Sequence, residues 1–323
     1  MKKILFTLFA GSIGFTSSGQ EHTVAIAGDD ITQGEKLIEA YFTPMAESFG
    51  SGLNSGWYNT AKPHSLGGFD LTFTLNTVII PNVAETFKIG DEFGGVFTST
   101  EADAASTIFG SSETTSMIYN HSSSVELPEG ASINFDMPGG FETPAIPLPM
   151  LQAGIGLIKN TAIDIRYMPM LNIGDVGKVN LFGVGVKHDL LQWIPGIGDA
   201  VPMSLSLQGG YTSLNTELKI AEQAVSLNTK AITINLVASK KVLMITGYSG
   251  VGYNSSTTNF SADADFELSG IKFQERITMD FESKNNLRAN VGLRFNITLL
   301  TIQADYTFAE YPTATLGVGV SLR

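Results

Sequence analysis

The strongest constraint on the fold is a strict two-residue alternation that continues to the C-terminus. In residues 287–297 every odd position is apolar and every even position is polar or glycine. The same alternation recurs in residues 301–308 and 313–323. Because successive side chains of a β-strand point to opposite faces, each segment has one apolar and one polar face. Strands that cross a membrane need about 9–11 residues of this kind, so the pattern indicates membrane-spanning strands.

The composition of the polar face distinguishes a membrane barrel from a soluble β-sandwich. An exposed sandwich face carries many Lys and Glu residues, whereas here the polar positions are mostly Thr, Asn, Gly and Ser, which suits a crowded lumen. Similar alternation occurs at 69–76, 163–167, 182–187 and 232–236. We therefore predict an all-β fold in which residues 66–323 form a transmembrane antiparallel β-barrel of about 12–14 strands.

The N-terminus has the features of a secretory signal peptide, assigned to residues 1–20. Lys2 and Lys3 precede an apolar run at 4–10 and small residues at 11–19. The chain has 19 basic and 31 acidic residues, which disfavours nucleic acid as a partner. It has no cysteine, so disulfides, thiolate metal ligands and a lipidated cysteine are excluded. These features indicate export to the bacterial outer membrane.

Residues 21–65 change period and predict a helical segment that acts as a plug or lid. Apolar residues repeat there at helical spacing: Leu37, Ile38, Tyr41, Phe42, Met45 and Phe49. Thr43 and Pro44 fit the N-cap and first position of a restarted helix, and Gly50 fits a helix end. The apolar face requires a docking surface, which is the lumen, the periplasmic mouth or a partner.

Loop lengths orient the barrel. The joints at 158–160, 240–241 and 298–300 are short, whereas 81–147, 214–229 and 257–284 are predicted to be long loops. Short turns belong to the periplasm and long loops to the outside, so 81–147 is predicted to be an extracellular loop with hairpins of its own. Aromatic residues that fit the membrane interface are Trp193, Tyr306 and Phe308.

Charged and polar residues on the lumen side of the predicted strands are the candidate wall of a pore. They are Asp164, Arg166, Lys187, Arg288, Arg294, Gln303 and Asp305. Direct pairing of Arg294 with Asp305 across a hairpin is one expectation, serving either a plug or a pore, or simply satisfying lumen charges.

Enzyme chemistry has no support in the sequence. The histidines are far apart and lack HExxH spacing, and each Gly-x-Gly pair lies within a predicted strand instead of opening a helix. We therefore predict no catalytic residues, no metal site and no cofactor.

A family resemblance supports the barrel. Residues 56–63, 152–157, 161–169 and 183–189 resemble an uncharacterised outer-membrane barrel family of Bacteroidota. The N-terminal helix and Asn59-Thr60-Ala61 are more distantly similar to FadL-type transporters of hydrophobic compounds, although Thr60 replaces the proline usual there. In those transporters such a segment forms a plug inside a fourteen-stranded barrel, so the resemblance implies a plugged barrel.

Two functional hypotheses remain open. The first is a channel or transporter for small or hydrophobic compounds, gated by residues 31–57. The second is a non-transporting barrel that serves as a subunit or scaffold of an envelope complex and docks through 81–147. Expected partners are outer-membrane lipid, a small hydrophobic ligand in the first case and other envelope proteins in the second.

Overall fold

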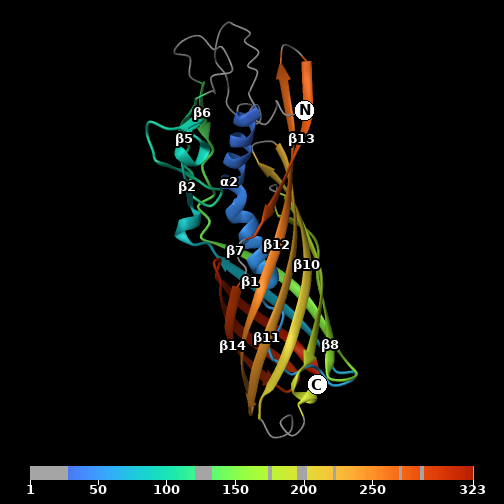
Figure 1. The fold of residues 1–323 in the computed structure, drawn as a ribbon. Coiled ribbons are helices and arrows are strands. Elements are labelled where there is room, and N and C mark those ends of the chain that lie inside the picture. The colour runs from blue at the N-terminus through green and yellow to red at the C-terminus, as the bar shows by residue number, and fades with distance from the viewer. Residues whose placement is uncertain are drawn as a thin grey trace.

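A computed structural model describes residues 28–120, 133–173, 177–194, 202–220, 223–268, 271–283 and 287–322. The predicted signal peptide lies outside these residues. The described chain forms a tall β-barrel with one helix that descends into it from one end (Figure 1). In this part of the chain, no helix combines the length and apolar character needed to cross a membrane.

Ten antiparallel strands close the barrel. They are β1 (Phe69–Ile79), β7 (Ala145–Leu157), β8 (Thr161–Ile173), β9 (Gly177–Asp189), β10 (Ser204–Ile220), β11 (Gln223–Val242), β12 (Ile245–Leu268), β14 (Leu287–Ile297), β15 (Leu300–Phe308) and β16 (Thr313–Leu322). Closure is complete because β1 pairs with both β7 and β16, and β11 pairs with β12. The transmembrane antiparallel barrel predicted from the alternation is therefore confirmed.

The predicted count of twelve to fourteen strands is too high. Residues 81–120 and 133–144 form two small sheets outside the barrel ring instead of spanning strands. The first pairs β2 (Thr86–Lys88) with β4 (Ala104–Ser106), and the second contains β3 (Phe97–Thr98), β5 (Thr115–Tyr119) and β6 (Ile133–Met137). The 3-10 turn η1 (Asn82–Ala84) precedes β2, and η2 (Asp91–Phe93) lies between β2 and β3. Strands this short fall below the roughly 9–11 residues that a spanning strand requires.

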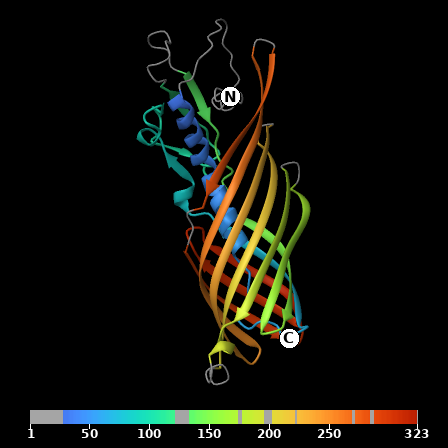
Figure 2. The same cartoon turned by 45° about the vertical axis from the view of Figure 1, so that its right-hand side comes forward.

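The eleventh strand of the main sheet, β13 (Ile271–Glu282), also stays outside the closed ring. It pairs with residues 257–268 of β12, whereas β14 pairs with residues 245–253 of the same strand. The long strand β12 therefore has two successive neighbours on one edge. The upper hairpin β12–β13 rises beyond the barrel wall, as Figure 2 shows.

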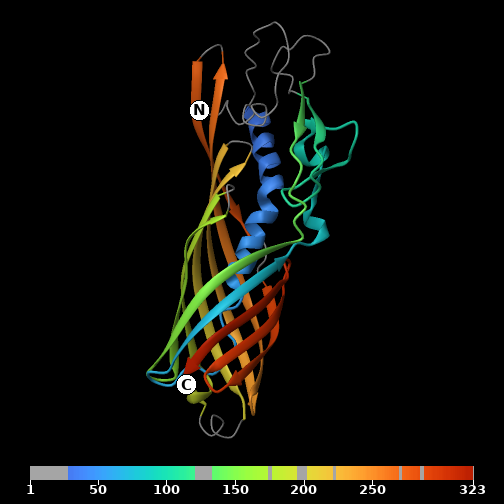
Figure 3. The ribbon, with the colours of Figure 1, turned by 180° about the vertical axis from the view of Figure 1, so that it is seen from behind.

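Helix α2 (Gly28–Asn54) runs between the long strands and the small sheets and then enters the barrel (Figure 3). The predicted restart at Pro44 is wrong, because the helix is continuous through this residue. Thr43 does not cap a helix; its Oγ1 donates to the Glu39 carbonyl at 2.7 Å. Gly50 does not end the helix either. A Cβ at Gly50 would lie 2.0 Å from Ser256 Oγ, so glycine allows close packing of helix on strand.

The face of the strands that carries apolar side chains changes along the barrel axis, from the outer face to the inner one. We call the end of the barrel at which α2 enters the upper end. In the lower part of β11, Ile232 and Ile234 face outward and are exposed, whereas Thr233 faces inward and is buried. In the upper part, Val225 and Leu227 face inward and are buried. We call the exposed, outward-facing apolar side chains of the lower strands, such as Ile232 and Ile234, the apolar belt. Above this belt the interior packs on α2 and the exterior carries polar side chains.

This reversal explains why two predicted loops are wrong. Residues 214–229 and 257–284 were expected to be long loops, yet they include the upper halves of β10 to β13. Among the described side chains there, Leu214, Leu227 and Phe260 point inward and are buried, whereas Asn215, Ser226 and Asn259 are exposed on the outer face. These segments therefore lack the pattern of lipid-facing strands. The short turn expected at 240–241 instead lies at 243–244. The other two short turns, 158–160 and 298–299, match the prediction.

Candidate functional site: the plugged lumen

The lower lumen is occupied by residues 55–65, which we call the plug and which follow α2 directly. Arg166 on β8 binds the junction between helix and plug. Its guanidinium donates to the carbonyls of Leu53 at 2.9 Å and Ser55 at 2.8 Å. Its Nε donates to Gln152 Oε1 at 2.8 Å, and its Cζ lies 3.7 Å from the ring centroid of Trp57. A wall cation thereby satisfies carbonyls that the helix end leaves unpaired.

Arg288 on β14 binds the same helix end from the opposite wall. It donates through Nη1 to the Asn54 carbonyl and through Nη2 to Thr307 Oγ1 at 3.0 Å. Both arginines were predicted as lumen residues, but their role as caps of α2 was not. No sequence pattern shows this role, because helix and strands are brought together only by the closed barrel.

Arg294 binds the middle of the plug. It donates to Asn59 Oδ1 at 2.6 Å, and the Asn59 amide in turn donates to Gln303. The predicted pairing of Arg294 with Asp305 is wrong. The register places Arg294 opposite Gln303 and Asp305 opposite Gly292, because the β14–β15 turn occupies residues 298–299. Asp305 instead accepts a hydrogen bond from the Tyr248 hydroxyl at 2.9 Å.

Trp57 is buried against the wall of the lower lumen formed by β9 and β10. A Cβ at Gly210 would lie 2.5 Å from its ring, and one at Gly185 would lie 2.7 Å from it. These wall glycines therefore make room for the indole. One cavity between plug and wall, lined by residues of both, has a volume of about 10 Å³. This is at the lower limit for a single water molecule, so the plug leaves little space against this part of the wall.

The lower end of the plug is bound to three strands. Ser239 accepts a hydrogen bond from the Ala61 backbone N–H at 2.9 Å, and Ser206 donates to the Ala61 carbonyl. His64 Nε2 and Asp70 Oδ1 lie 2.5 Å apart, and both residues are buried. The plug is thus attached to the wall along its whole length.

The structure places all seven predicted lumen residues inside the barrel, each less than a tenth exposed. Asp164 lies 3.5 Å from the Gln152 amide, and Lys187 is buried in the same wall region beside the plug. The six apolar residues predicted for the plug or gate are also buried, but on the part of α2 above the plug. There they pack in one core with the upper strands and the small sheets.

Two of the three predicted interface aromatics are well exposed on the outer surface. Trp193 lies on a 3-10 turn, η3 (Leu191–Trp193), is 62% exposed, and donates through Nε1 to His188 at 2.9 Å. Phe308 is 57% exposed. Tyr306 is half-buried, with its ring centroid 4.9 Å from that of Phe308.

The described chain is thus a ten-strand barrel with a plug in its lumen. The model of a family of unknown function, DUF6588, matches residues 1–322. The chain belongs to this family. Comparison with curated proteins gives no sequence match.

Solved structures similar to this DUF6588 chain are outer-membrane proteins. The translocator domain of the autotransporter NalP from Neisseria meningitidis has 10% identity and a TM-score of 0.32, with 90% of this chain and 97% of that chain covered. The attachment invasion locus protein Ail of Yersinia pestis has 9% identity and a TM-score of 0.28, with 80% and 99% covered. The resemblance to FadL-type transporters and to barrels of Bacteroidota stays a prediction.

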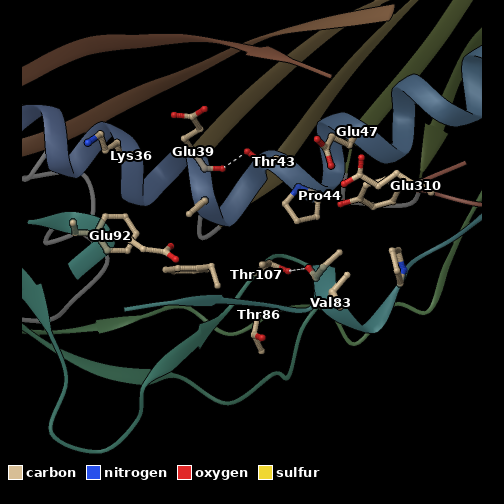
Figure 4. Close-up of a pocket in the computed structure, with 16 residues that line it drawn as sticks. Lys36, Glu39, Thr43, Pro44, Glu47, Val83, Thr86, Glu92, Thr107 and Glu310 are labelled. Carbon is tan, nitrogen blue, oxygen red and sulfur yellow. Dashed lines mark hydrogen bonds between the residues drawn. The ribbon is translucent and has the colours of Figure 1, made fainter. Parts of the chain in front are cut away.

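A second candidate site lies above the barrel, between α2 and residues 81–107. It is a cavity of about 430 Å³, within the range of small-ligand pockets (Figure 4). Pro44 and Glu47 line it from the helix, and Glu92 lines it from the turn η2. Glu310 and Tyr311 line it from the β15–β16 connection. Burial, and then the neighbouring Glu47 carboxylate, raise the pKa of the Tyr311 hydroxyl. The cavity connects three separate segments in the region above the plug.

The described residues contain no group of three or more His, Asp or Glu side chains placed to hold a metal ion.

Proposed function

We propose that this protein is an outer-membrane anchor whose barrel is closed by its own N-terminal segment. In this proposal the barrel does not transport. It holds α2 and the small sheets rigidly above the membrane, where they form a binding surface for other envelope proteins. The observation that carries the proposal is the filled lower lumen, in which three wall arginines bind the plug.

The energy of plug attachment supports a permanent rather than a mobile plug. Four hydrogen bonds run from the arginines to the helix end and the plug. Hydrogen bonds to charged groups contribute about 1.5–3 kcal/mol each, so these four contribute roughly 6–12 kcal/mol. This is comparable with the entire free energy of unfolding of a typical domain, about 5–15 kcal/mol. Release of the plug would require all four of these bonds to break together.

Single-channel recording in planar bilayers tests the proposal. The protein should show no conductance, whereas a variant that lacks residues 31–65, and therefore the whole plug, should conduct through the emptied polar lumen. An Arg166→Lys variant, which keeps the charge, serves as the control and should stay closed. Steady ion conductance by the unmodified protein would overturn the proposal.

The second candidate is a channel that opens when the plug leaves. One observation favours it: the wall behind the plug is polar and charged, with Asp164, Lys187 and Arg288 all facing inward. A wall of this kind would hydrate if emptied. Brief, voltage-dependent openings of the unmodified protein would favour this candidate, and permeation of a hydrophobic solute would identify it with the transport hypothesis.

A further inference from the structure

Four asparagines and one aspartate form a straight row across five neighbouring strands. The register pairs Asn180 with Asn215, Asn215 with Asn228, Asn228 with Asn259, and Asn259 with Asp280. We call these five residues the amide row. It lies on the upper halves of β9 to β13, the part of the sheet that rises above the short strands in Figure 1.

The amide row faces outward, away from α2. Asn215, Asn259 and Asp280 are exposed. Leu227, which precedes Asn228 of the row, and Phe260, which follows Asn259, are buried against the core. Side chains link the row in two places. Asn228 donates to Asn215, and Asn259 donates to Asp280. These bonds use the carbonyl oxygen of Asn215 and the amide nitrogen of Asn259, so each residue retains its other amide atom for a ligand.

A groove follows the amide row. All four asparagines line a cavity of about 380 Å³, together with Ser226 and Ser261. Lys178 and Glu217 are its charged lining residues, and they face each other across the β9–β10 pair. The groove therefore has a mixed lining, with Met170, Val179 and Leu227 beside the polar residues, and its two charged residues have opposite signs. Neighbouring strands are about 4.8 Å apart, so five strands give the row a length of roughly 19 Å.

The position of the row relative to the apolar belt limits what can bind there. On β11, the outward residue Ile232 belongs to the belt, and Asn228 lies four positions above it. At about 3.3 Å per residue this is roughly 13 Å along a tilted strand. The polar headgroup zone of a bilayer is about 5–7 Å thick on each side, so the row lies just beyond it. The outward residue between them is Lys230, which is exposed.

We propose that the amide row binds the saccharide portion of a glycolipid in the adjacent membrane leaflet. Neutral amides donate and accept hydrogen bonds as sugar hydroxyls do, and an extended row with a shallow groove matches a chain of sugar rings. The outer sugars of a membrane-anchored glycolipid extend beyond the headgroup zone, to the level of the row. The near-neutral lining disfavours phosphate as the bound group.

Binding of defined glycolipids to the full-length purified protein tests the proposal. The probes are lipopolysaccharide that carries only lipid A and core sugars, lipid A alone, and the free core oligosaccharide. The variant Asn215→Ala/Asn259→Ala removes exposed members of the row. The matched control, Asn82→Ala/Asn134→Ala, removes two exposed asparagines from the region of the small sheets.

The row variant should bind the core-bearing lipopolysaccharide at least tenfold more weakly than the unmodified protein and bind lipid A unchanged. The control variant should bind both probes as the unmodified protein does. Equal affinity of the row variant and unmodified protein for the core-bearing probe would overturn the proposal. Binding of the free oligosaccharide as tight as that of the lipid-linked form would overturn the glycolipid as its source.

Folding is checked by the heat-dependent gel mobility of the barrel. If the alanine variant does not fold, Asn215→Thr/Asn259→Thr replaces it, because threonine suits a strand and its short hydroxyl cannot reproduce both ends of an amide. The expected tenfold loss is the same. The proposal does not depend on whether the barrel conducts, so its failure and that of the anchor function are distinguishable.

Discussion

The lower and upper halves of the barrel interior bury opposite kinds of side chain. Below, Arg166, Arg288 and Arg294 bind a plug through hydrogen bonds. Above, Phe260 and its neighbours pack on the apolar side of α2, with ring centroids of Phe260 and Phe42 4.8 Å apart. The difference follows from what lies outside. A lipid-facing exterior leaves polar side chains for the lumen, whereas a water-facing exterior leaves apolar side chains for a core.

The largest effect is expected in the lower half, at Arg166. Arg166→Ala removes three hydrogen bonds and the contact with the Trp57 ring. We expect a loss of at least about 4 kcal/mol in the free energy of unfolding, because charged hydrogen bonds contribute about 1.5–3 kcal/mol each. Urea unfolding in detergent measures this loss. A change below 1 kcal/mol would mean that the plug is attached mainly by other contacts.

Phe260 provides the corresponding test in the upper half. Phe260→Ala should cost about 3–5 kcal/mol by leaving a cavity between α2 and β13. Unlike changes at the plug, it should leave bilayer conductance at zero, because the lower lumen stays filled. Urea unfolding should therefore show the loss of stability, whereas the conductance should stay at zero. Conductance by this variant would show that the upper core, not the wall arginines, holds the plug.

The reversal of polarity along β11 can be tested on its outer face. Ile234→Lys places a charge in the apolar belt and should cost about 2–4 kcal/mol if the residue lies near the bilayer midplane. Ser226→Lys, on the outward face of the same strand above the belt, should change stability by less than about 0.5 kcal/mol. Equal effects, measured by unfolding in liposomes, would mean that the membrane boundary is misplaced.

The smallest effect is expected from adding volume beside Trp57. Gly210→Val places side-chain atoms against the indole and should cost about 1–3 kcal/mol through overpacking. Gly209→Val is the matched control, because a Cβ there would meet its nearest atom, of Val186, at an ordinary 3.9 Å. The midpoint of thermal unfolding compares the two. A control as unstable as Gly210→Val would indicate a general cost of valine in β10.

Much of the candidate site was predictable as a set of residues but not as an arrangement. Alternation alone assigned Arg288, Arg294 and Asp305 to the lumen side of their strands. It did not reveal that Arg294 meets Asn59, because the partner comes from a segment 235 positions away. The register of a hairpin depends on which residues form its turn, and a shift there moved Asp305 away from Arg294. The upper strands were missed because their reversed polarity does not match lipid-facing strands.

The sequence by itself determined the solvent on each face of the lower strands, since the choice of side chain at every second position is a direct response to lipid outside and polar surroundings inside. It also determined that residues 37–49 form an amphipathic helix. Only the tertiary structure decided the strand number, the continuity of α2 through Pro44 and the filling of the lumen. Each of these depends on contacts between distant segments. Packing against the barrel and the small sheets holds the helix straight, and ring closure brings the wall arginines to its end.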